Sequence, residues 1–563
     1  MSSSRDVAPS RPIPTARPEI SLGSVNSVAD SPTRTADPAR RTDLDALRGV
    51  AMILGIVLHA LLSFIPTPWP VQDTRQNGLF FIPYAAIHMF RMPLFFLISG
   101  FFTMFILQRH GLGGMIRQRV QRILFPLLLA LITIVPVDNL IKKEARMLHA
   151  PAPAERSHLV NAILSGDQSA VIRQLDLGTS VNQEDPAYGL SPLCWASLAG
   201  NDRAVLLLLE RGADLKWKDA DGNTPLHHAA LFCHPNTVRL LLDHGADTSV
   251  RDKVGSTPLG LCAMMLQWKR EAADKLGQQL PSEPELRRNI HETLVVLTPP
   301  AKSLSFAAWF DRVSARYREF LISNDFLIKV KGHSLHLFDA EVLDHLWFLW
   351  LLLWLVGGVS LAVWAGFPPS GKFLWWIPPL TLLPQAFMGT ALGPDAWLGP
   401  LPPPHLLLYY GLFFWFGAAL FSRDGMATRM GRGWQILLPA GLLILLPSAF
   451  LLIGDRGAGS LVQCGYAWVV TLGIMGLFAS YCSHLGYRAH WFSDSTYWMY
   501  LAHLPLVLAV QIAVVNLPWP SSLKFLLVMF IVTLLLLASY RWLVRYTWIG
   551  TLLNGPRKPP RAG

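Results

Sequence analysis

The sequence predicts an all-α fold in which a polytopic membrane bundle of about ten transmembrane helices carries an inserted α-solenoid. One observation is the composition: 52% of the 563 residues are hydrophobic, only 15% are charged, and the apolar residues gather in blocks. These blocks approach the roughly 20 residues that cross a hydrocarbon core of about 30 Å. The other observation is a 33-residue repeat inside one long polar interval. Together they exclude a soluble enzyme, a fibre and a β-barrel porin.

The net charge of +11 reflects membrane topology, because Arg and Lys lie mainly at the ends of apolar blocks and in the tails. The five cysteines contain no CxxC pair, so neither a disulfide framework nor a zinc site is indicated. We expect no nucleic-acid partner, no metal and no bound cofactor. Residues 1–40 are rich in Ser, Pro, Thr, Ala and Arg and lack the apolar core of a signal peptide, which predicts a disordered cytoplasmic tail.

The apolar runs predict the spans of the bundle in order. They cover residues 44–65, 80–107, 119–140, 345–365, 373–392, 406–421, 434–453, 461–482, 496–517 and 523–546. Several of these runs contain Pro or Gly, which a bundle tolerates where neighbouring helices satisfy the freed backbone groups.

Basic residues predict how the spans are oriented, because Arg and Lys favour cytoplasmic loops. Such residues precede the first run, separate the second from the third, and follow the sixth and the tenth. We therefore expect both termini to be cytoplasmic, including a basic tail at 549–563, and the polar interval 141–344 to lie on the outer face. The first two basic groups are Arg40, Arg41 and Arg48, and then Arg109, Arg117, Arg119 and Arg122.

The polar interval contains a repeat that resembles ankyrin repeats. Ser191, Thr224 and Thr257 each begin a Ser/Thr-Pro-Leu phrase, and successive phrases are 33 residues apart. Thr-Pro opens a first helix, a leucine run packs the second helix on its neighbour, and Gly212 or Gly245 permits the left-handed turn that follows. About four repeats fit between residues 157 and 298. Ankyrin arrays usually bind proteins, so we expect a protein-interaction module, with a structural insertion that has no partner as the alternative.

The first apolar run carries ionisable residues at helical spacing. Arg48 and His59 are eleven residues apart, which is almost three turns, so they share one face about 16 Å apart, with Asp45 one turn from Arg48. Ionisable groups deep in a membrane are costly and often functional, and a satisfied core histidine is the alternative for His59. Arg48 alone could snorkel or set topology. Asp45 is expected to pair with Arg48 or to stabilise the helix N-terminus.

Several phrases in the membrane runs resemble acyltransferase family 3, a family of integral membrane O-acyltransferases. One phrase is an Arg, ten residues and a His in the first run, and the phrase Asp-His-Leu-Trp-Phe-Leu favours the branch associated with acylating periplasmic glucans. The other phrases lie at residues 90–101, 117–126, 344–349 and 495–505. The resemblance implies two parts of one membrane domain, residues 41–140 with three spans and residues 300–548 with about seven, separated by the ankyrin-like insertion 157–298.

The resemblance implies cytoplasmic acyl-CoA as the donor and a glycan or another hydroxyl compound as the acceptor. Arginines at the inner boundary are expected to bind the donor phosphates through charge-assisted hydrogen bonds. These are Arg48, Arg117, Arg119 and Arg122. The pantetheine arm would then reach towards His59, the predicted general base, because imidazole titrates near neutral pH. A covalent acyl-histidine is the alternative. The predicted catalytic residues are His59, Arg48 and Asp45.

Five further residues are secondary candidates. His88 begins the second run and Asp344 and His345 open the fourth, on the same side as His59. They could orient His59, bind sugar hydroxyls or face lipid headgroups. Tyr500 and His503 lie in the ninth run, where they could hydrogen-bond towards the catalytic region or make a structural bond between helices.

The sequence as a whole predicts a multi-pass O-acyltransferase of the bacterial inner membrane, surrounded by lipid, that moves an acetyl-class or succinyl-class group to an outer glycan. The inner-membrane location follows from the resemblance. A transporter or flippase of a small polar or glycan substrate is the alternative, because buried His and Arg could serve substrate movement. No similarity between the two halves suggests transporter repeats. A membrane-anchored ankyrin scaffold is a further alternative.

Overall fold

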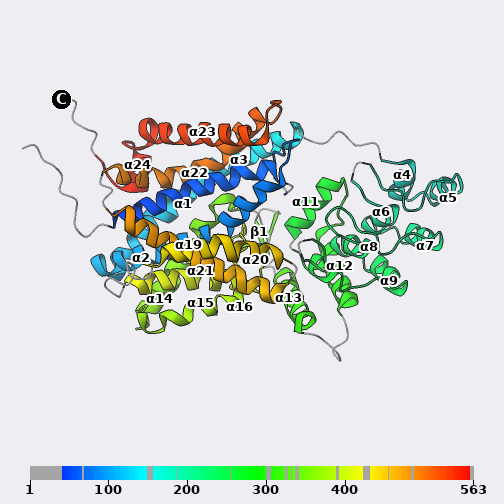
Figure 1. Ribbon diagram of the computed structural model, residues 1–563, viewed down its shortest axis with the longest axis horizontal. Coiled ribbons are helices and arrows are strands. Elements are labelled where there is room, and N and C mark those ends of the chain that lie inside the picture. The colour runs from blue at the N-terminus through cyan, green and yellow to red at the C-terminus, as the bar shows by residue number, and fades with distance from the viewer. Residues whose placement is uncertain are drawn as a thin grey trace, which may run out of the picture. The chain divides into compact units, whose positions relative to one another are not determined.

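The computed structural model describes most of the chain between residues 41 and 557. The described residues are 41–65, 67, 69–148, 156–186, 188–253, 255–264, 266–298, 306–323, 327–330, 333–336, 342–388, 392–421, 432–453, 455–483 and 487–557. The predicted N-terminal tail and residues 558–563 of the predicted basic tail lie outside them. Helices dominate, which confirms the all-α class (Figure 1). A short antiparallel hairpin of β1 (Leu327–Val330) and β2 (His333–His336) was not predicted.

The first part of the helix bundle folds back on itself at a glycine. It contains α1 (Thr42–Leu61), α2 (Phe81–Arg119), the π-helical turn η3 (Val120–Leu124) and α3 (Phe125–Leu148). α2 is interrupted at Gly111, whose φ of 67° is in the left-handed region that glycine tolerates. Arg119 donates a hydrogen bond to Thr103 across this point. The second and third predicted spans are therefore joined at Gly111, and helical structure resumes before the predicted start at residue 119.

The second part of the bundle contains one broken segment. Its elements are η5 (Asp344–Leu346), α14 (Trp347–Trp364), η6 (Gly371–Trp376), α15 (Ile377–Leu380), α16 (Leu382–Gln385), α17 (Pro404–Phe421), α19 (Trp434–Ala440), η7 (Gly441–Leu445), α20 (Leu446–Leu451), α21 (Arg456–Tyr481), α22 (Tyr487–Val514), α23 (Ser521–Ser539), η8 (Tyr540–Val544) and α24 (Trp548–Asn554). The predicted span 373–392 is divided among η6, α15 and α16, and residues 389–391 lie outside the described part. Pro378, Pro379 and Pro384 account for the breaks, because proline removes a backbone donor and clashes with the preceding turn.

The structure confirms a polytopic helix bundle but does not confirm the count of ten spans. Within the described residues, eight helical segments are long and apolar enough to cross a membrane. One of them, Gly78–Ala145, contains two predicted spans, and the broken segment at 371–385 is not among the eight.

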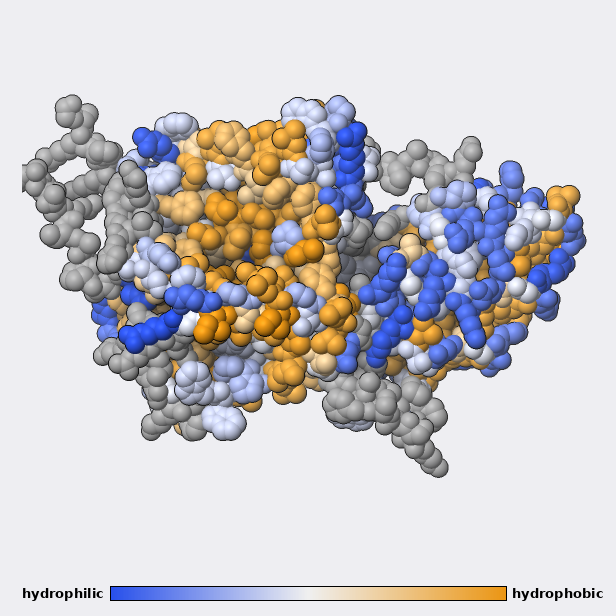
Figure 2. All heavy atoms as spheres, viewed as in Figure 1, coloured by the Kyte–Doolittle hydropathy of each residue, from blue (hydrophilic) through white to orange (hydrophobic). Residues whose placement is uncertain are grey.

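Large apolar side chains cover the outside of the bundle. Figure 2 shows them over its visible face, whereas hydrophilic residues are denser over the ankyrin-like repeats. Exposed examples from different helices are Ile132, Trp364 and Ile436. Apolar surface this extensive suits hydrocarbon rather than water. The chain is therefore a membrane protein.

Close helix contacts shape the interior of the bundle. A Cβ at Gly100 of α2 would collide with the carbonyl oxygen of Phe414, and one at Gly417 of α17 would collide with that of Leu97. Small residues allow membrane helices to approach backbone to backbone in this way. α1 also packs along α22, although these helices are more than 400 residues apart in sequence (Figure 1).

The repeats form the predicted α-solenoid, with paired helices around their own apolar core. The helices are α4 (His158–Ser165), α5 (Gln168–Asp176), α6 (Pro192–Ala199), α7 (Asp202–Glu210), α8 (Pro225–Leu231), α9 (Pro235–Asp243), α10 (Pro258–Cys262), α11 (Leu266–Leu276) and α12 (Glu283–Leu297), followed by α13 (Phe306–Ser323). Ser191, Thr224 and Thr257 are the N-cap residues before the helix-opening prolines. Gly212 and Gly245 have φ of 85° and 91°, as the predicted left-handed turns require.

Candidate active site

Three histidines that are far apart in the sequence meet inside the bundle. His59 lies in the last turn of α1, His503 in α22 and His345 in η5. The ring centroids of His59 and His503 are 5.1 Å apart, and those of His503 and His345 are 5.3 Å apart. We call these three residues the histidine cluster. It unites the predicted base with two of the predicted secondary candidates.

Each member of the histidine cluster has a buried ring nitrogen without a hydrogen-bond partner in the described part of the chain. These atoms are Nδ1 of His59, Nε2 of His503 and Nδ1 of His345. An unsatisfied buried polar atom costs about 1–3 kcal/mol, and native proteins contain few of them. Three in contacting rings indicate a place where a ligand, a water molecule or a proton is handled.

Hydrogen bonds fix the tautomers of two of these rings. Nδ1 of His503 lies 2.7 Å from the carbonyl oxygen of Tyr500, and Nε2 of His345 lies 3.0 Å from that of Leu501. A carbonyl oxygen can only accept, so both of these ring nitrogens carry the hydrogen. In the neutral ring the other nitrogen then has a lone pair. Nε2 of His503 and Nδ1 of His345 are therefore free to accept a proton.

Two residues that the sequence analysis did not select hold His59 in place. The side chain of Gln511 donates from Nε2 to the carbonyl oxygens of His59 and Ala60, at 3.2 and 3.3 Å. Trp69 donates from Nε1 to Oε1 of Gln511 at 2.8 Å and stacks on the His59 ring, with centroids 5.6 Å apart. The side-chain amide of Gln511 thus provides hydrogen bonds for the last carbonyl groups of α1 and holds Trp69 against the His59 ring.

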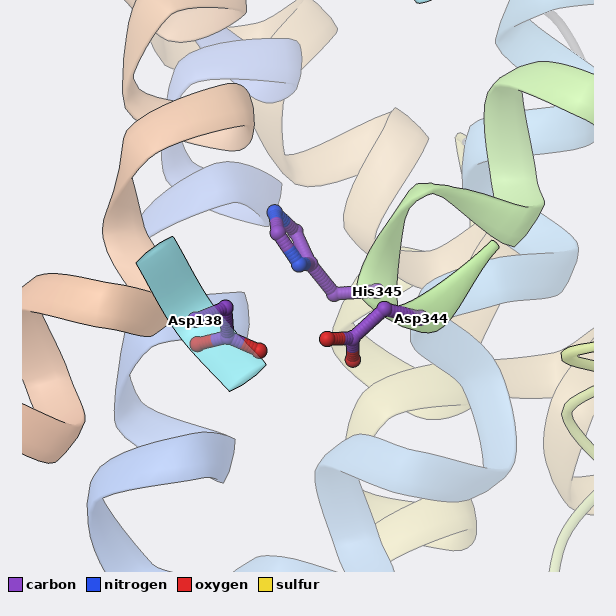
Figure 3. Close-up of side chains that lie close together, drawn as sticks. All are labelled: Asp138, Asp344 and His345. Atoms are coloured by element: carbon purple, nitrogen blue, oxygen red, sulfur yellow. The ribbon is translucent and has the colours of Figure 1, made fainter. Parts of the chain in front are cut away.

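Acidic and basic side chains of α3 and η5 lie beside His345. Nζ of Lys142 is 2.8 Å from Asp138 and 2.7 Å from Asp344. Figure 3 shows the two carboxylates facing each other with the His345 ring next to them. Asp344 has a φ of 47°, a left-handed conformation that costs energy in a residue other than glycine and is common at functional sites. We call Asp138, Lys142 and Asp344 the carboxylate cluster.

The sequence contained a signal for Asp138 and Lys142 that the analysis did not use. They are charged residues four apart at the end of an apolar run, which is the spacing of neighbours on a helix face. Ligand atoms of Asp138, Asp344 and His345 lie within 4.8 Å of one another, as a metal site would require. Lys142, however, already places its ammonium between the two carboxylates.

Tyr500 and Arg91 complete the surroundings of the histidines. The hydroxyl of Tyr500 donates to the carbonyl oxygen of His345 at 2.6 Å, which ties α22 to η5. The guanidinium of Arg91 in α2 lies against Gly55 of α1, where a side chain would collide with it. Gly55 is four residues before His59, so Arg91 contacts α1 about one turn from His59.

The remaining secondary candidate, His88, lies one turn before Arg91 on α2. Its ring stacks on Tyr84, with centroids 5.5 Å apart, and it packs against Gly393 in the loop before α17. The structure does not bring it into ring contact with the histidine cluster in the described residues.

The start of α1 meets α22 through a serine. Arg48 donates to Oγ of Ser493 at 3.0 Å, and this hydroxyl donates to Asp45 at 3.2 Å. Ser493 therefore links the two residues that the sequence predicted as a pair.

The predicted phosphate-binding arginines are not equivalent. Arg119 lies within electrostatic range of Arg48 and donates to Thr103. Arg122 is half-buried beside Gly555, and its backbone carbonyl accepts a hydrogen bond from Tyr497. Arg117 is exposed. Three arginines from α1, α2 and η3 thus gather at the end of α1 opposite His59, and Arg117 points to the surface.

Comparisons with known proteins match the first part of the helix bundle and the ankyrin-like repeats separately. Residues 41–152 match the family model of an acyltransferase domain, and residues 159–265 match ankyrin repeats in three copies. Both matches confirm the resemblances seen in the sequence. The acyltransferase match contains α1, α2 and α3, and therefore Arg48, His59, Asp138 and Lys142.

The chain is also similar to curated bacterial proteins. Glucans biosynthesis protein C of Shigella dysenteriae serotype 1 is 36% identical over 95 residues, which cover 17% of this chain and 25% of that protein. The protein of the same name from Escherichia coli K12 is 35% identical over 95 residues with the same coverage. That from Salmonella paratyphi B is 34% identical over 88 residues, 16% of this chain and 23% of that protein. The chain thus spans about a quarter of the length of these relatives.

Proposed function

We propose that this protein is a membrane-bound O-acyltransferase that moves an acetyl-class or succinyl-class group from cytoplasmic acyl-CoA to a hydroxyl of an extracytoplasmic glycan. The observation that carries the proposal is His59, which lies in the segment matching an acyltransferase domain and has a buried Nδ1 with no partner in the described residues. The relatives' name, glucans biosynthesis protein C, supports a glycan as the acceptor.

The donor is proposed to bind at the end of α1 that carries Arg48. Arg48, Arg119 and Arg122 bring three positive charges to this end, and guanidinium groups bind phosphate oxygens well. Arg48 and His59 are on one continuous helix, almost three turns apart. A donor with its phosphates at Arg48 and its arm along α1 would bring the thioester towards His59.

The proposed reaction begins with a hydroxyl of the acceptor near His59. His59 takes the hydroxyl proton as the oxygen attacks the thioester carbon, so that an ester C–O bond forms and the C–S bond breaks. The thiolate of coenzyme A leaves and takes up a proton. Gln511 and Trp69 hold His59 in position for this step.

Placement in the cell follows from the same proposal. The arginine-rich end of α1 would face the cytoplasm, with both termini on that side of a bacterial inner membrane and the ankyrin repeats on the outer side. There the repeats would bind a protein partner, because ankyrin arrays present concave surfaces to proteins.

The test is mass spectrometry of periplasmic and surface glycans from cells with the wild-type protein, the His59→Ala variant or no protein. We expect an acyl mass increment with the wild type alone, and transfer by His59→Ala reduced at least 100-fold, because a positioned acid–base group contributes about 10²–10⁴-fold. The matched control is His110→Ala, because His110 is an exposed histidine of the same bundle.

Identical glycans in all three strains, with the wild-type protein folded in the membrane, would contradict the acyltransferase proposal and favour a transporter. Full transfer by His59→Ala would remove only His59 from the mechanism.

A further inference from the structure

The carboxylate cluster combines two carboxyl groups with one ammonium. Lys142 pairs with both Asp138 and Asp344, so one ammonium faces two carboxylates. An uncompensated charge is costly in a low-dielectric interior. The cluster therefore has room for one further positive charge.

The same cluster extends from the interior of the bundle towards its surface. The side chain of Asp138 is 0% exposed, that of Asp344 is 13% exposed and that of Lys142 is 21% exposed. A proton received at the buried end can therefore leave through groups that reach the surface of the bundle.

His345 connects this cluster to the other histidines. One of its ring nitrogens must lie within 4.8 Å of the carboxylate oxygens of Asp138 and Asp344 (Figure 3). Because Nε2 is bonded to Leu501, the nitrogen that is free to exchange a proton is Nδ1. The His345 ring is also in edge-to-face contact with His503.

His503 stands between His345 and His59. The centroid of its ring is 5.3 Å from that of His345 and 5.1 Å from that of His59. Its Nε2 has no hydrogen-bond partner in the described residues and carries a lone pair. Rings whose centroids are this close can exchange a proton directly or through a single bridging water molecule.

The other charged or titratable groups around this path have fixed roles. Arg91 from α2 keeps its proton, because guanidinium is not deprotonated in proteins. Tyr500 from α22 already donates its hydrogen to the His345 carbonyl. Lys142 from α3 holds both carboxylates. The groups left to carry a proton are the histidine cluster and the two carboxylates.

We propose that the histidine and carboxylate clusters form a proton path that carries the acceptor's proton from His59 to the surface of the bundle. The inference rests on the proposed function. His59 first binds the hydroxyl proton. The proton then leaves the His59 nitrogen and binds Nε2 of His503, leaves that atom and binds Nδ1 of His345, and passes to a carboxylate of the cluster, from which it is released to water. The departing thiolate takes its own proton from the donor side, so charge and atoms balance.

The experiment uses the full chain in lipid nanodiscs, with acetyl-CoA and succinyl-CoA as donors and a linear glucan oligosaccharide as acceptor. His503→Gln keeps a hydrogen-bonding side chain that cannot be protonated, and Asp138→Asn replaces one of the two proton-carrying carboxyl groups by a neutral amide of the same shape. For each variant kcat and both KM values are measured between pH 5.5 and 9, with increasing imidazole.

We expect kcat to fall about 10- to 100-fold in either variant while KM for donor and acceptor changes less than twofold. Added imidazole should raise kcat of His503→Gln at least threefold, because a soluble base can replace the missing His503 side chain as proton carrier. A purely structural role would not produce rescue by imidazole.

The matched control is His405→Gln. Its Nε2 is also buried without a hydrogen bond in the described chain, but it faces the Asp395 carboxylate at 3.9 Å, and His405 lies at the start of α17, where it contacts Tyr317. We expect wild-type kcat from this variant.

If His503→Gln fails to fold, the kcat and KM values of Asp138→Asn test the proton path instead. Wild-type kcat in the folded variants, or a loss that imidazole does not relieve, would overturn the proton path alone. Absence of transfer by the wild type would overturn the proposed function and the path with it.

Discussion

The ankyrin repeats and the helix bundle both bury histidines, but they treat the ring nitrogens differently. In the repeats, Nδ1 of His227 accepts from the backbone N–H of Thr224, and Nε2 donates to the carbonyl oxygen of Ser256. Burial lowers the pKa of His227 to about 4, which keeps it neutral. In the bundle, His59, His345 and His503 each have a buried nitrogen without a partner in the described residues.

The difference separates a structural histidine from one available for chemistry. His227 completes a capping box at the start of α8, so both of its nitrogens are used by the fold. A histidine with one free nitrogen has kept its capacity to bind a proton or a ligand, at a cost in stability that the surrounding packing must offset. Burial alone therefore says little, and hydrogen-bond satisfaction says more.

The largest expected effect is on stability, and it concerns the buried ion pair between Lys524 and Asp73 in the bundle. Lys524 donates to Asp73 and to the carbonyl oxygen of Val515, both at 2.7 Å, and the paired side chains are each 1% exposed. Asp73→Asn should lower stability by about 3–5 kcal/mol, because it leaves a buried ammonium without its counter-ion. Thermal unfolding in nanodiscs measures the change.

The control for Asp73→Asn is the double variant with Lys524→Met, which replaces the buried charges by apolar or neutral groups. It should recover most of the stability, as breaking a buried pair is worse than removing it. A double variant as unstable as the single one would show that the loss of stability comes from the loop that contains Asp73, and not from breaking the ion pair.

The next-largest expected effect is also on stability, and it concerns His228, a buried histidine of the repeats that is paired with Asp219. Nε2 of His228 lies 3.1 Å from Asp219. Burial lowers the pKa of His228, but the hydrogen bond to Asp219 outweighs it and raises the pKa to about 9. The folded state therefore holds a proton that the unfolded state loses above pH about 6.5. The stability from this pair is present below that pH and should be lost, by about 3 kcal/mol, as pH rises through 9.

Hydrogen exchange of α8 in the full-length protein at pH 6.5 and 9.5 would measure this loss. His228→Gln should show no additional loss of protection at the higher pH. Equal protection of the wild type at both pH values would mean that His228 is not charged in the folded repeats.

The smallest effect concerns the arginines at the other end of α1. Arg119→Ala should raise KM for the acyl-CoA donor about tenfold, or about 1.4 kcal/mol, because a charge-assisted contact to phosphate is lost. Arg109→Ala is the matched control, since Arg109 is an exposed arginine of the same helix. Equal KM values for the two variants would remove Arg119 from the donor site.

The sequence predicted the parts of the molecule whose signal is local. The 33-residue period identified the repeats, and helical spacing placed Arg48 and His59 on α1. It also selected His345 and His503, but only as separate candidates, because nothing in a single sequence says that η5 and α22 meet.

The sequence failed where the outcome depends on tertiary contacts. The apolar run at 373–392 has the composition of a span, yet three prolines divide its described part into short helices. Asp138 and Lys142 look like the polar end of a helix until Asp344, about 200 residues later, packs against them. His88 was predicted at the depth of His59; its ring stacks on Tyr84, and a role for it beside His59 stays a prediction.

The contacts between α1 and the last helices have a consequence for how the chain is made. The bonds from Gln511 to His59 and from Lys524 to Asp73 each join residues more than 450 positions apart. The ankyrin repeats, whose contacts are mostly with the next repeat, can fold while the ribosome is still translating α14. The first three helices must instead wait in the lipid, with Asp73 lacking its counter-ion and the carbonyl end of α1 lacking Gln511, until α22 and α23 have been inserted. The histidine cluster is thus the last part of the molecule to be completed, and a chain that terminates early leaves a finished solenoid on an unfinished helix bundle.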